Sequence, residues 1–306
     1  MTLADAEHFV RDPDWTWYIL FYFFFAGLSG GSYFLASLMR LNGNKLDAPA
    51  VRIGYYVAFF MLLPCPVLLT LDLGKPLRFW HMLVNTTPGD VGVSFKYWSP
   101  MSVGAWALVV YGGFATVSFL EAWARGRGRS VRLMEGFLGK LWAIVGGLLA
   151  LFIAGYTGVL LSVSNQPVWS DTWALGGLFL ASGLSGSAAL LAWLVHRRRD
   201  GQASAVALGR SERFFPLLEL ALIGIFVATL IPAGTLGQAF GFPWFLLWAV
   251  AFIGLLPGLA GMARPRVTTD STGAAVATRS GMLVVAAFIV LIGVLALRAA
   301  VIFSVQ

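Results

Sequence analysis

Charged residues, cysteine and histidine are all scarce in this chain. Of its 306 residues, 11% are charged, against about 25% in a typical soluble domain. The single cysteine, Cys65, excludes an intrachain disulfide and falls short of the four thiolates that hold an iron–sulfur cluster. The three histidines, His8, His81 and His196, cannot form a facing pair for a haem. Any redox chemistry then needs a diffusible molecule and a partner protein, and no metal site is expected.

Apolar residues make up much of the remainder, 58% of the chain, with a mean hydropathy of +0.80. A run of about 20 apolar residues is long enough to cross a bilayer as a helix. The alternating pattern of a β-barrel is absent, so the predicted fold class is an all-α integral membrane protein. We expect eight transmembrane helices, at 16–38, 53–71, 99–120, 141–162, 173–195, 214–232, 242–261 and 281–303.

A short pattern of small residues occurs twice, about half the chain apart. Gly27–Ser32 reads GLSGGS and Gly183–Ser187 reads GLSGS, and each copy precedes a basic turn. The repeat predicts two four-helix bundles in parallel orientation, over residues 1–165 and 166–306. Small residues let membrane helices approach closely, and we expect this to be their main role.

Basic residues are concentrated in four turns, near 40–52, 121–140, 196–213 and 264–279. Cytoplasmic loops of membrane proteins carry an excess of Lys and Arg, so we place these turns in the cytoplasm. Both termini and the 72–98 loop then lie outside, as in a multi-pass protein of a bacterial inner membrane. The net charge of +7 is explained by this topology and by the lipid bilayer, without nucleic acid as a partner.

The stretch LTLDLGKPLRFWHML, residues 69–83, gathers four polar side chains at the end of the second helix. They are Asp72, Lys75, Arg78 and His81, whereas the matching end of the sixth helix, 231–234, has no charge. Two bundles that served only as a symmetric scaffold would not need this difference in charge between the two helix ends, whereas a functional site in one bundle would. The alternative is an interfacial hairpin whose charges meet lipid headgroups and water.

Three further polar residues lie inside the predicted helices. Tyr156 is expected near the depth of the cluster, and its hydroxyl is bonded either to Asp72 or His81 or to a backbone carbonyl. Glu219 is either a proton-relay group or a structural acid. Arg298 either snorkels to the interface or binds helix-end carbonyls.

Three motifs together resemble the NrfD-like membrane subunits, which include that of polysulfide reductase. They are Gly27–Ser32, Asp72–Trp80, and the stretch from Tyr156-Thr157-Gly158 through Pro167-Val168-Trp169. The resemblance covers nearly the whole chain. It implies a haem-free subunit that binds a quinone, menaquinone or ubiquinone, in the first bundle near the outer face. It also implies an iron–sulfur subunit docked on that face and a molybdopterin catalytic subunit beyond it.

The resemblance also assigns residues. A tyrosine of the fourth helix and a polar residue of the first contact the quinone in such subunits. Tyr156 matches the tyrosine, and Trp17, Tyr18, Tyr22 and Ser29 are candidates in the first helix. We expect Asp72 or His81 to accept protons, and Glu219 to belong to a proton path. The other expected quinone-binding residues are Lys75, Arg78, Trp80 and Ser162.

The predicted function is the quinone-reactive membrane subunit of a multi-subunit oxidoreductase, which is not catalytic alone. Two alternatives stay open: a passive membrane anchor, and a proton or ion transporter. A transporter breaks helices near the midplane, and Pro64 and Pro66 are placed to do this.

Overall fold

The computed structural model describes residues 13, 15–129, 136–198, 204, 208, 214–262, 267–269, 275–277 and 280–305. The long helices are α1 (Trp17–Asn42), α2 (Ala48–Leu62), α3 (Pro64–Asp72), α4 (Pro100–Gly126), α5 (Gly136–Ser162), α6 (Leu175–His196), α8 (Phe214–Ala233), α10 (Phe245–Leu259) and α11 (Ser280–Phe303). The short ones are the 3₁₀ helices η2 (Lys45–Asp47) and η3 (Pro76–Met82), and α9 (Leu236–Phe240). Two hairpins pair β1 (Val84–Thr87) with β2 (Asp90–Val93), and β3 (Val267–Thr269) with β4 (Ala275–Ala277).

Seven helices in the described residues are long and apolar enough to cross a membrane, with Ala48–Asp72 counted as one. The backbone at Leu63, between α2 and α3, keeps helical dihedral angles (φ −55°, ψ −43°), so the prolines do not break this span. The eighth predicted helix appears as α10, which has only 15 residues, fewer than the roughly 20 that span a bilayer. The all-helical membrane class is confirmed, while eight crossings stay a prediction.

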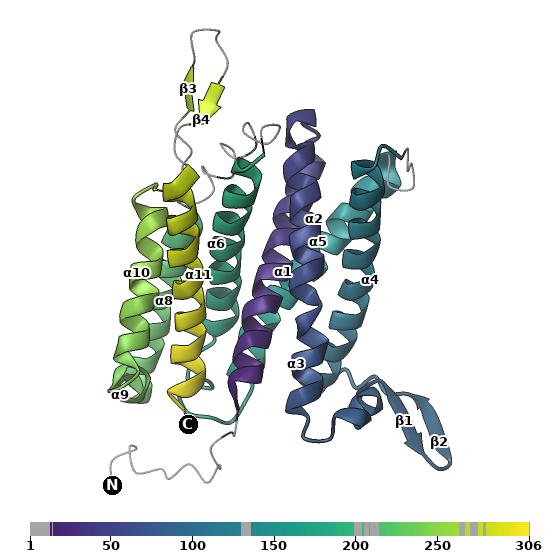
Figure 1. The fold of residues 1–306 in the computed structure, drawn as a ribbon. Coiled ribbons are helices and arrows are strands. Elements are labelled where there is room, and N and C mark those ends of the chain that lie inside the picture. The colour runs from purple at the N-terminus through teal and green to yellow at the C-terminus, as the bar shows by residue number, and fades with distance from the viewer. Residues whose placement is uncertain are drawn as a thin grey trace.

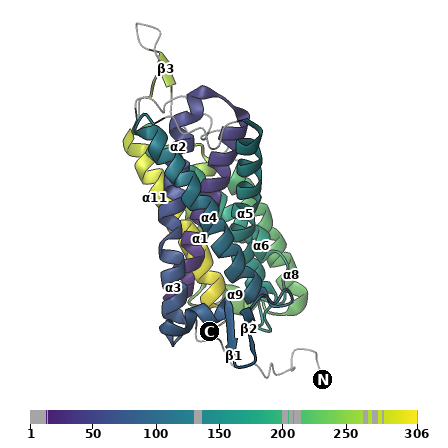
Figure 2. The ribbon, with the colours of Figure 1, turned by 90° about the vertical axis from the view of Figure 1, so that its right-hand side faces the viewer.

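The helices stand side by side and reach two opposite ends of the molecule (Figure 1). α1 and α6 pack against each other in the centre, with α4 and α5 on one side and α8, α10 and α11 on the other. One end carries η3, the β1–β2 hairpin and the end of α11, and we call it the "hairpin end" after the β1–β2 hairpin (Figure 2). At the opposite "arginine end" lie the last turns of α1, α4 and α6 and the first turn of α2, which carry Arg40, Arg125, Arg197 and Arg52.

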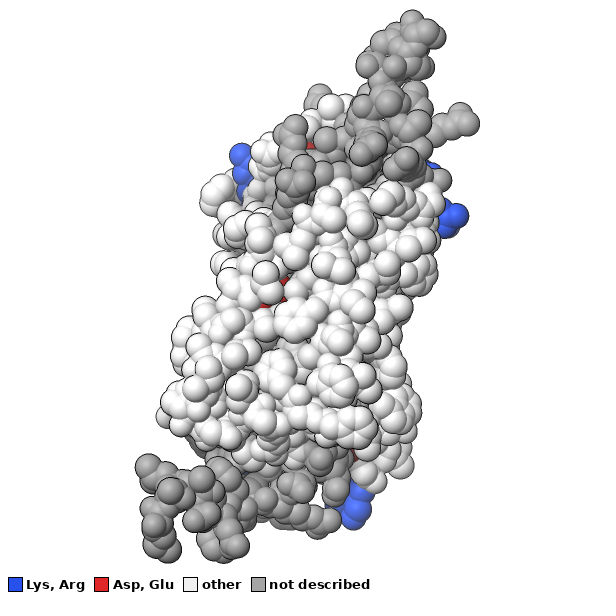
Figure 3. All heavy atoms as spheres, turned by 90° about the vertical axis from the view of Figure 1, so that its left-hand side faces the viewer, with Lys and Arg blue, Asp and Glu red and all other residues white. Residues whose placement is uncertain are grey.

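A belt of almost uncharged surface separates the two ends. On the face shown in Figure 3, Lys and Arg atoms lie only near the ends of the molecule. Many large apolar side chains of α4, α5, α8, α10 and α11 are exposed, among them Leu148 (62%), Ile231 (61%) and Ile292 (55%). Such a belt suits the hydrocarbon core of a bilayer, where charged groups are costly.

The two small-residue motifs lie against each other where α1 meets α6. A Cβ built on Gly183 would lie 3.0 Å from the carbonyl oxygen of Gly27, and one on Gly31 would lie 2.8 Å from that of Gly183. The Ser187 hydroxyl crosses the interface and donates to the Leu28 carbonyl (3.0 Å). The expected role of these residues, the close approach of two helix backbones, is therefore confirmed.

Arg298 ties α11 to α6 in the interior. Its side chain is fully buried (0% exposed), so the expected alternative of snorkelling to the interface is wrong. Its guanidinium donates to the Ser182 hydroxyl (2.8 Å) and to the carbonyls of Phe179 (3.0 Å) and Val294 (3.2 Å). The alternative of carbonyl binding is confirmed, although these carbonyls lie within helices rather than at their ends.

Candidate functional site

A pocket of about 230 Å³ opens at the hairpin end, between α1, α3, η3, α4 and α5. Most of its lining is apolar. The lining residues are Trp15, Ile19, Tyr22, Phe23, Pro66, Leu69, Thr70, Asp72, Leu73, Phe79, Met82, Leu83, Met101, Gly104, Ala105, Leu108, Val109, Tyr156 and Leu160. Pockets that enclose drug-sized ligands start at about 300 Å³. This smaller pocket therefore suits a ligand that places a single ring system inside and leaves any attached chain outside.

A sharp turn of the backbone after α3 closes the pocket. α3 ends at Asp72, and Gly74 takes a left-handed conformation (φ 66°) that glycine adopts without steric cost. Lys75 has a non-helical backbone (φ −129°, ψ 77°), since a following proline disfavours the helical region, and Pro76 then begins η3. The turn folds η3 back over the end of α3, where Phe79 and Met82 line the pocket.

Tyr156 reaches across the pocket from α5 to α4. Its hydroxyl donates a hydrogen bond to the carbonyl of Pro100, in the first turn of α4. This is the carbonyl alternative that the sequence left open, and it excludes Asp72 and His81 as acceptors of that proton. The ring of Tyr156 lies on Gly104, where a Cβ would overlap it. Since the proton is donated to Pro100, the hydroxyl oxygen stays available as an acceptor.

Asp72 and Tyr22 supply further polar groups to the same pocket. Asp72 is the one charged residue among the described lining residues, half-buried at the end of α3. Tyr22 lies on α1 and is 4% exposed. A tyrosine buried to this degree needs a partner for its hydroxyl, and a ligand oxygen in the pocket would provide one. The structure thus brings Asp72, Tyr22 and Tyr156 together.

The other residues expected from the 69–83 stretch lie outside the pocket. Lys75, Arg78, Trp80 and His81 are all exposed. The ring of His81 stacks on that of Trp80 (centroids 3.9 Å apart), and its Nδ1 lies 3.2 Å from the Arg78 carbonyl. His81 is therefore displayed on the outer surface of η3 rather than beside Tyr156.

Two expected quinone contacts are engaged in bonds within and between helices. Ser29 is fully buried, donates to the Ala58 carbonyl (2.7 Å) and shares a hydrogen bond with the Tyr111 hydroxyl (2.8 Å). Ser162 donates to the carbonyl of Gly158 (3.3 Å), one turn back in α5. Neither residue lines the pocket.

Glu219 lies far from this pocket, on α8. It is 2% exposed, and its Oε2 atom has no hydrogen-bond partner within the described ranges of the chain. Among described residues, no ion pair joins it to Arg298 within 4.0 Å. The proton path through Glu219 stays a prediction.

The sequence did not point to α4 as a wall of the pocket. Met101, Gly104, Ala105, Leu108 and Val109 all line it. These positions repeat at intervals of three and four residues, which places them on one face of a helix. That stripe is the signal available in the sequence, although its apolar character does not distinguish it from an ordinary packing face.

Comparison with known proteins agrees with the three motifs. The sequence profile of the family described as "Polysulphide reductase, NrfD" matches residues 7–306. A polysulfide reductase subunit of Wolinella succinogenes is 29% identical over 322 residues, 95% of this chain and 94% of that protein. Protein NrfD of Escherichia coli is 26% identical over 332 residues, 100% of this chain and 99% of that protein.

A third relative matches over a shorter stretch. A selenate reductase subunit of Mesobacillus selenatarsenatis is 35% identical over 77 residues, which are 25% of this chain and only 18% of that subunit. The family profile, by contrast, spans nearly all of the chain. The resemblance read from the motifs is therefore confirmed: the chain belongs to the NrfD family and is a multi-pass membrane protein of it.

Proposed function

We propose that this chain is the haem-free, quinone-reactive membrane subunit of a multi-subunit oxidoreductase. The observation that carries the proposal is the pocket at the hairpin end, an apolar slot with Asp72, Tyr22 and Tyr156 in its wall. A quinone head group has the matching form, a flat apolar ring with an oxygen on either side. The size of the pocket fits a ring whose isoprenoid tail lies in lipid.

Each polar group has a distinct role in this proposal. A bound quinol supplies two electrons and two protons when it is oxidised, whether the quinone is menaquinone or ubiquinone. Tyr156 accepts a hydrogen bond from one hydroxyl, because its own proton is donated to Pro100. Tyr22 orients the ring from α1, and Asp72, at the membrane edge, accepts the two protons one after the other and passes each to water before it takes the next.

The electrons leave through the hairpin end. The segment after α3 exposes large apolar side chains, including Leu77 (88%), Tyr97 (75%) and Trp98 (68%). η3 also covers the pocket, so an iron–sulfur subunit docked there would lie close to the ring. The names of the polysulfide and selenate reductase relatives support further subunits in the complex, and we propose that a molybdopterin subunit beyond the iron–sulfur subunit performs the substrate chemistry.

The membrane arrangement completes the proposal. The hairpin end faces outward from a bacterial inner membrane, since the basic turns lie at the other end. α10 is the eighth span in this proposal: its 15 residues reach roughly 22 Å at about 1.5 Å per residue. Residues 1–165 and 166–306 then form two four-helix bundles related by the internal repeat.

The test uses the complete complex with Asp72→Asn, Tyr22→Phe and Tyr156→Phe made separately. Loss of one positioned acid–base group costs about 10²–10⁴-fold in rate, and we expect at least one variant to slow quinol-linked turnover to that extent. Electron exchange between the soluble partners and an artificial dye should stay at the parental rate. Tyr18→Phe, on α1 but outside the lining, is the matched control, and His81→Ala tests the exposed histidine.

The alternative, a passive membrane anchor, predicts a different result. An anchor would assemble with its partners and keep dye-linked activity, yet no pocket substitution would change quinol turnover. If all three pocket variants turn over quinol at the parental rate, the quinone site lies elsewhere or is absent.

A further inference from the structure

The loop between α5 and α6 contains the end of the third sequence motif, Pro167-Val168-Trp169, which the proposed quinone chemistry does not use. The backbone of Val168 has a φ of 67°, and among the described residues it is the one non-glycine residue with a positive φ. Glycine adopts this conformation readily, whereas for a β-branched residue it is a genuine outlier. Such strained residues cluster at functional sites and persist only where the surrounding structure enforces them.

Hydrogen bonds on both sides of Val168 hold this turn in its shape. The Trp169 N–H donates to the Pro167 carbonyl (2.8 Å) and closes a three-residue turn around Val168. With a positive φ at its centre, this is the rare and strained form of the γ-turn. The Val168 N–H donates to the Asp171 carboxylate (2.8 Å), and the same oxygen accepts from the Thr235 hydroxyl (2.9 Å). One carboxylate therefore fixes the turn and joins it to the segment that leads into α9.

The side chain of Trp169 extends from this turn into the interior. It is 1% exposed, and its indole N–H donates to the Val301 carbonyl (2.7 Å) in the last turn of α11. Its ring lies against that of Trp15, with centroids 4.9 Å apart and planes inclined by 32°. Trp15 lines the pocket at the hairpin end and packs edge-on against Phe23, which lines it too. A continuous set of contacts thus runs from the turn to the wall of the pocket.

Trp15 depends on outside support because it lies before the first helix. α1 begins at Trp17, with Thr16 at its N-cap, so Trp15 is not part of the hydrogen-bonded helix. Of its two ring contacts, Phe23 belongs to α1, whereas Trp169 comes from a loop far along the chain. Aromatic pairs with inclined rings contribute beyond the area that they bury. Without Trp169, the ring of Trp15 would leave its place in the wall more often.

We propose that Trp169 is a positioning residue for the quinone pocket, which holds Trp15 in place so that the wall is formed before the ring binds. The strained turn at Val168 sets the direction of Trp169, and Asp171 fixes the turn. This role rests on the proposed quinone function. It also gives the second half of the chain a part in the pocket, because α11 and the segment before α9 anchor the turn. A preformed wall lowers the ordering cost of binding, so the effect belongs to affinity rather than to the chemical step.

The experiment uses the assembled complex and measures binding separately from turnover. A fluorescent hydroxyquinoline N-oxide, a quinol analogue, reports binding by the quenching of its fluorescence, and steady-state quinol oxidation gives KM and kcat. We expect Trp169→Leu to weaken analogue binding and to raise KM by about twofold to tenfold, the range that loss of one aromatic pair implies. Since the lost interaction is the same in the ground and transition states, kcat should stay at the parental value. Trp169→Phe, which keeps a ring against Trp15, should retain most of the affinity.

A double substitution tests whether Trp169 acts through Trp15. Trp15→Leu should weaken analogue binding by itself, because Trp15 lines the pocket. Trp169→Leu added to Trp15→Leu should then have little further effect, since residues that act through one contact are not additive. Full additivity of the two losses would contradict a role through Trp15.

Substitutions at Asp171 test the turn itself. Asp171→Ala removes the acceptor of the Val168 N–H and of the Thr235 hydroxyl, so KM and analogue binding should change in the same direction as in Trp169→Leu. Asp171→Asn keeps an acceptor oxygen and should retain part of the affinity. Thr235→Val removes only one of the two bonds; it should cause a smaller change of the same sign, and it carries the test if the alanine variant does not assemble.

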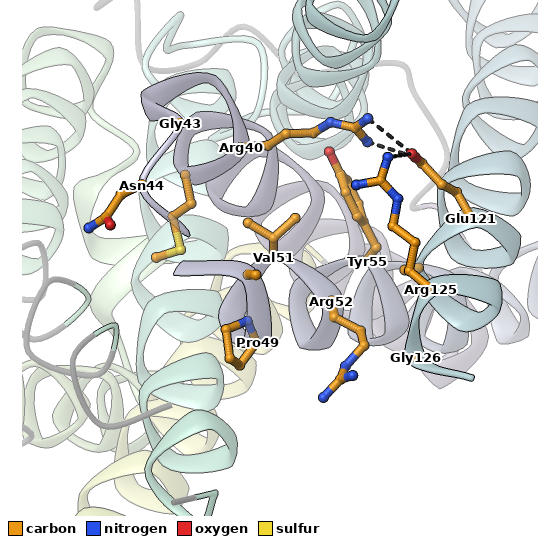
Figure 4. Close-up of a pocket in the computed structure, with 13 residues that line it drawn as sticks. Arg40, Gly43, Asn44, Pro49, Val51, Arg52, Tyr55, Glu121, Arg125 and Gly126 are labelled. Carbon is orange, nitrogen blue, oxygen red and sulfur yellow. Dashed lines mark hydrogen bonds and ion pairs between the residues drawn. The ribbon is translucent and has the colours of Figure 1, made fainter. Parts of the chain in front are cut away.

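Two variants serve as controls. Trp173→Leu removes an indole of the same loop that is 73% exposed and does not line the pocket. Glu121→Gln acts at the arginine end, where Arg40 and Arg125 bind the Glu121 carboxylate (2.7 Å each) and Arg40 joins α1 to α4 (Figure 4). Both should keep the parental KM and analogue affinity, even where thermal unfolding shows a loss of stability.

The outcomes separate the positioning role from the proposed function. If the parental complex binds the analogue and Trp169→Leu binds it equally well, the positioning role is wrong and the quinone site stands. An equal loss of affinity in either control would also overturn the role, because it would reflect general stability. If the parental complex binds no analogue, the quinone site is wrong and the positioning role falls with it.

Discussion

At the scale of single residues, the position of Tyr156 depends on a glycine that faces it. A Cβ at position 104 would overlap the ring of Tyr156. The Cβ is fixed to the backbone of α4, which cannot move aside as a flexible side chain would, so the tyrosine has to move. We therefore expect Gly104→Ala to displace the tyrosine hydroxyl from Pro100. A displacement of about 1 Å can cost about 10²-fold in rate, so quinol-linked turnover of the complex should fall by that order. Stopped-flow or steady-state quinol oxidation measures it.

Gly113→Ala provides the control on the same helix. No atom lies within 4 Å of the Cβ position at residue 113, so alanine there should leave turnover unchanged and stabilise the helix by up to about 1 kcal/mol. Parental quinol turnover in Gly104→Ala would mean that the position of Tyr156 does not limit the reaction.

Local backbone geometry explains which residues of the 69–83 stretch reach the pocket. Residues three apart are in line on a 3₁₀ helix, which has three residues per turn. In η3, Phe79 and Met82 accordingly face the pocket together, whereas Arg78 and His81 are in line with each other on its exposed side. The sequence singled out Asp72, Arg78 and His81 but did not show whether the segment after Pro76 is α-helical or 3₁₀, and that choice decides the position of His81.

At the scale of whole helices, the contact between α1 and α6 joins the two halves of the chain. The Cβ position of Gly31 lies 2.8 Å from the Gly183 carbonyl and 2.9 Å from the Cβ of Ser187. Gly31→Ala should push the helices apart and lower the free energy of unfolding by about 1–3 kcal/mol, the usual cost of overpacking. Thermal unfolding of the purified protein in one detergent measures the change.

Gly224→Ala is the matched substitution on α8, because nothing lies within 4 Å of its Cβ position. It should unfold at the parental temperature or above it. An equal loss of stability in both variants would indicate a general sensitivity of the helices to alanine rather than a close contact at Gly31.

Most helices were predictable because their limits depend on local features of the sequence. These are the length of apolar chain needed to cross a bilayer, and the proline and glycine residues that start or end a helix. Pro100 after Ser99 marks the start of α4, and Gly74 with Pro76 marks the end of α3, as the structure has them. The β1–β2 hairpin was not predicted. β1 (VNTT) has no alternating apolar pattern, and the two alternating valines of β2, Val91 and Val93, are a signal of only four residues and are exposed, so the usual signal of a half-buried strand is weak. The pocket wall on α4 was also missed, because it depends on contacts between distant segments.

At the scale of the whole molecule, the chain should carry no redox centre of its own. In the described residues no group of three or more His, Cys, Asp or Glu side chains is placed to hold a metal ion, and His196 and His81 lie at opposite ends. We expect the purified chain, freed of its partners, to show no haem Soret band and no iron–sulfur signal in electron paramagnetic resonance. A stoichiometric signal of either kind would contradict the proposal that the redox centres belong to the partner subunits and not to this chain.

The last prediction concerns the orientation of the molecule in the membrane. Cys65 is fully buried, so cysteines introduced at exposed positions can be labelled without removing it, and the parental protein serves as the unlabelled control. We expect a membrane-impermeant maleimide added to intact cells with a permeabilised outer membrane to label Leu77→Cys, at the hairpin end. Arg197→Cys, at the arginine end, should react only after the inner membrane is broken. This outcome would place the proposed quinone pocket at the outer face, where the proposed iron–sulfur partner docks. The reverse pattern would mean that the molecule has the opposite orientation in the membrane. Labelling of both positions from one side would contradict the arrangement of the spans, because the three helices between them, α4, α5 and α6, would then not connect opposite faces of the bilayer.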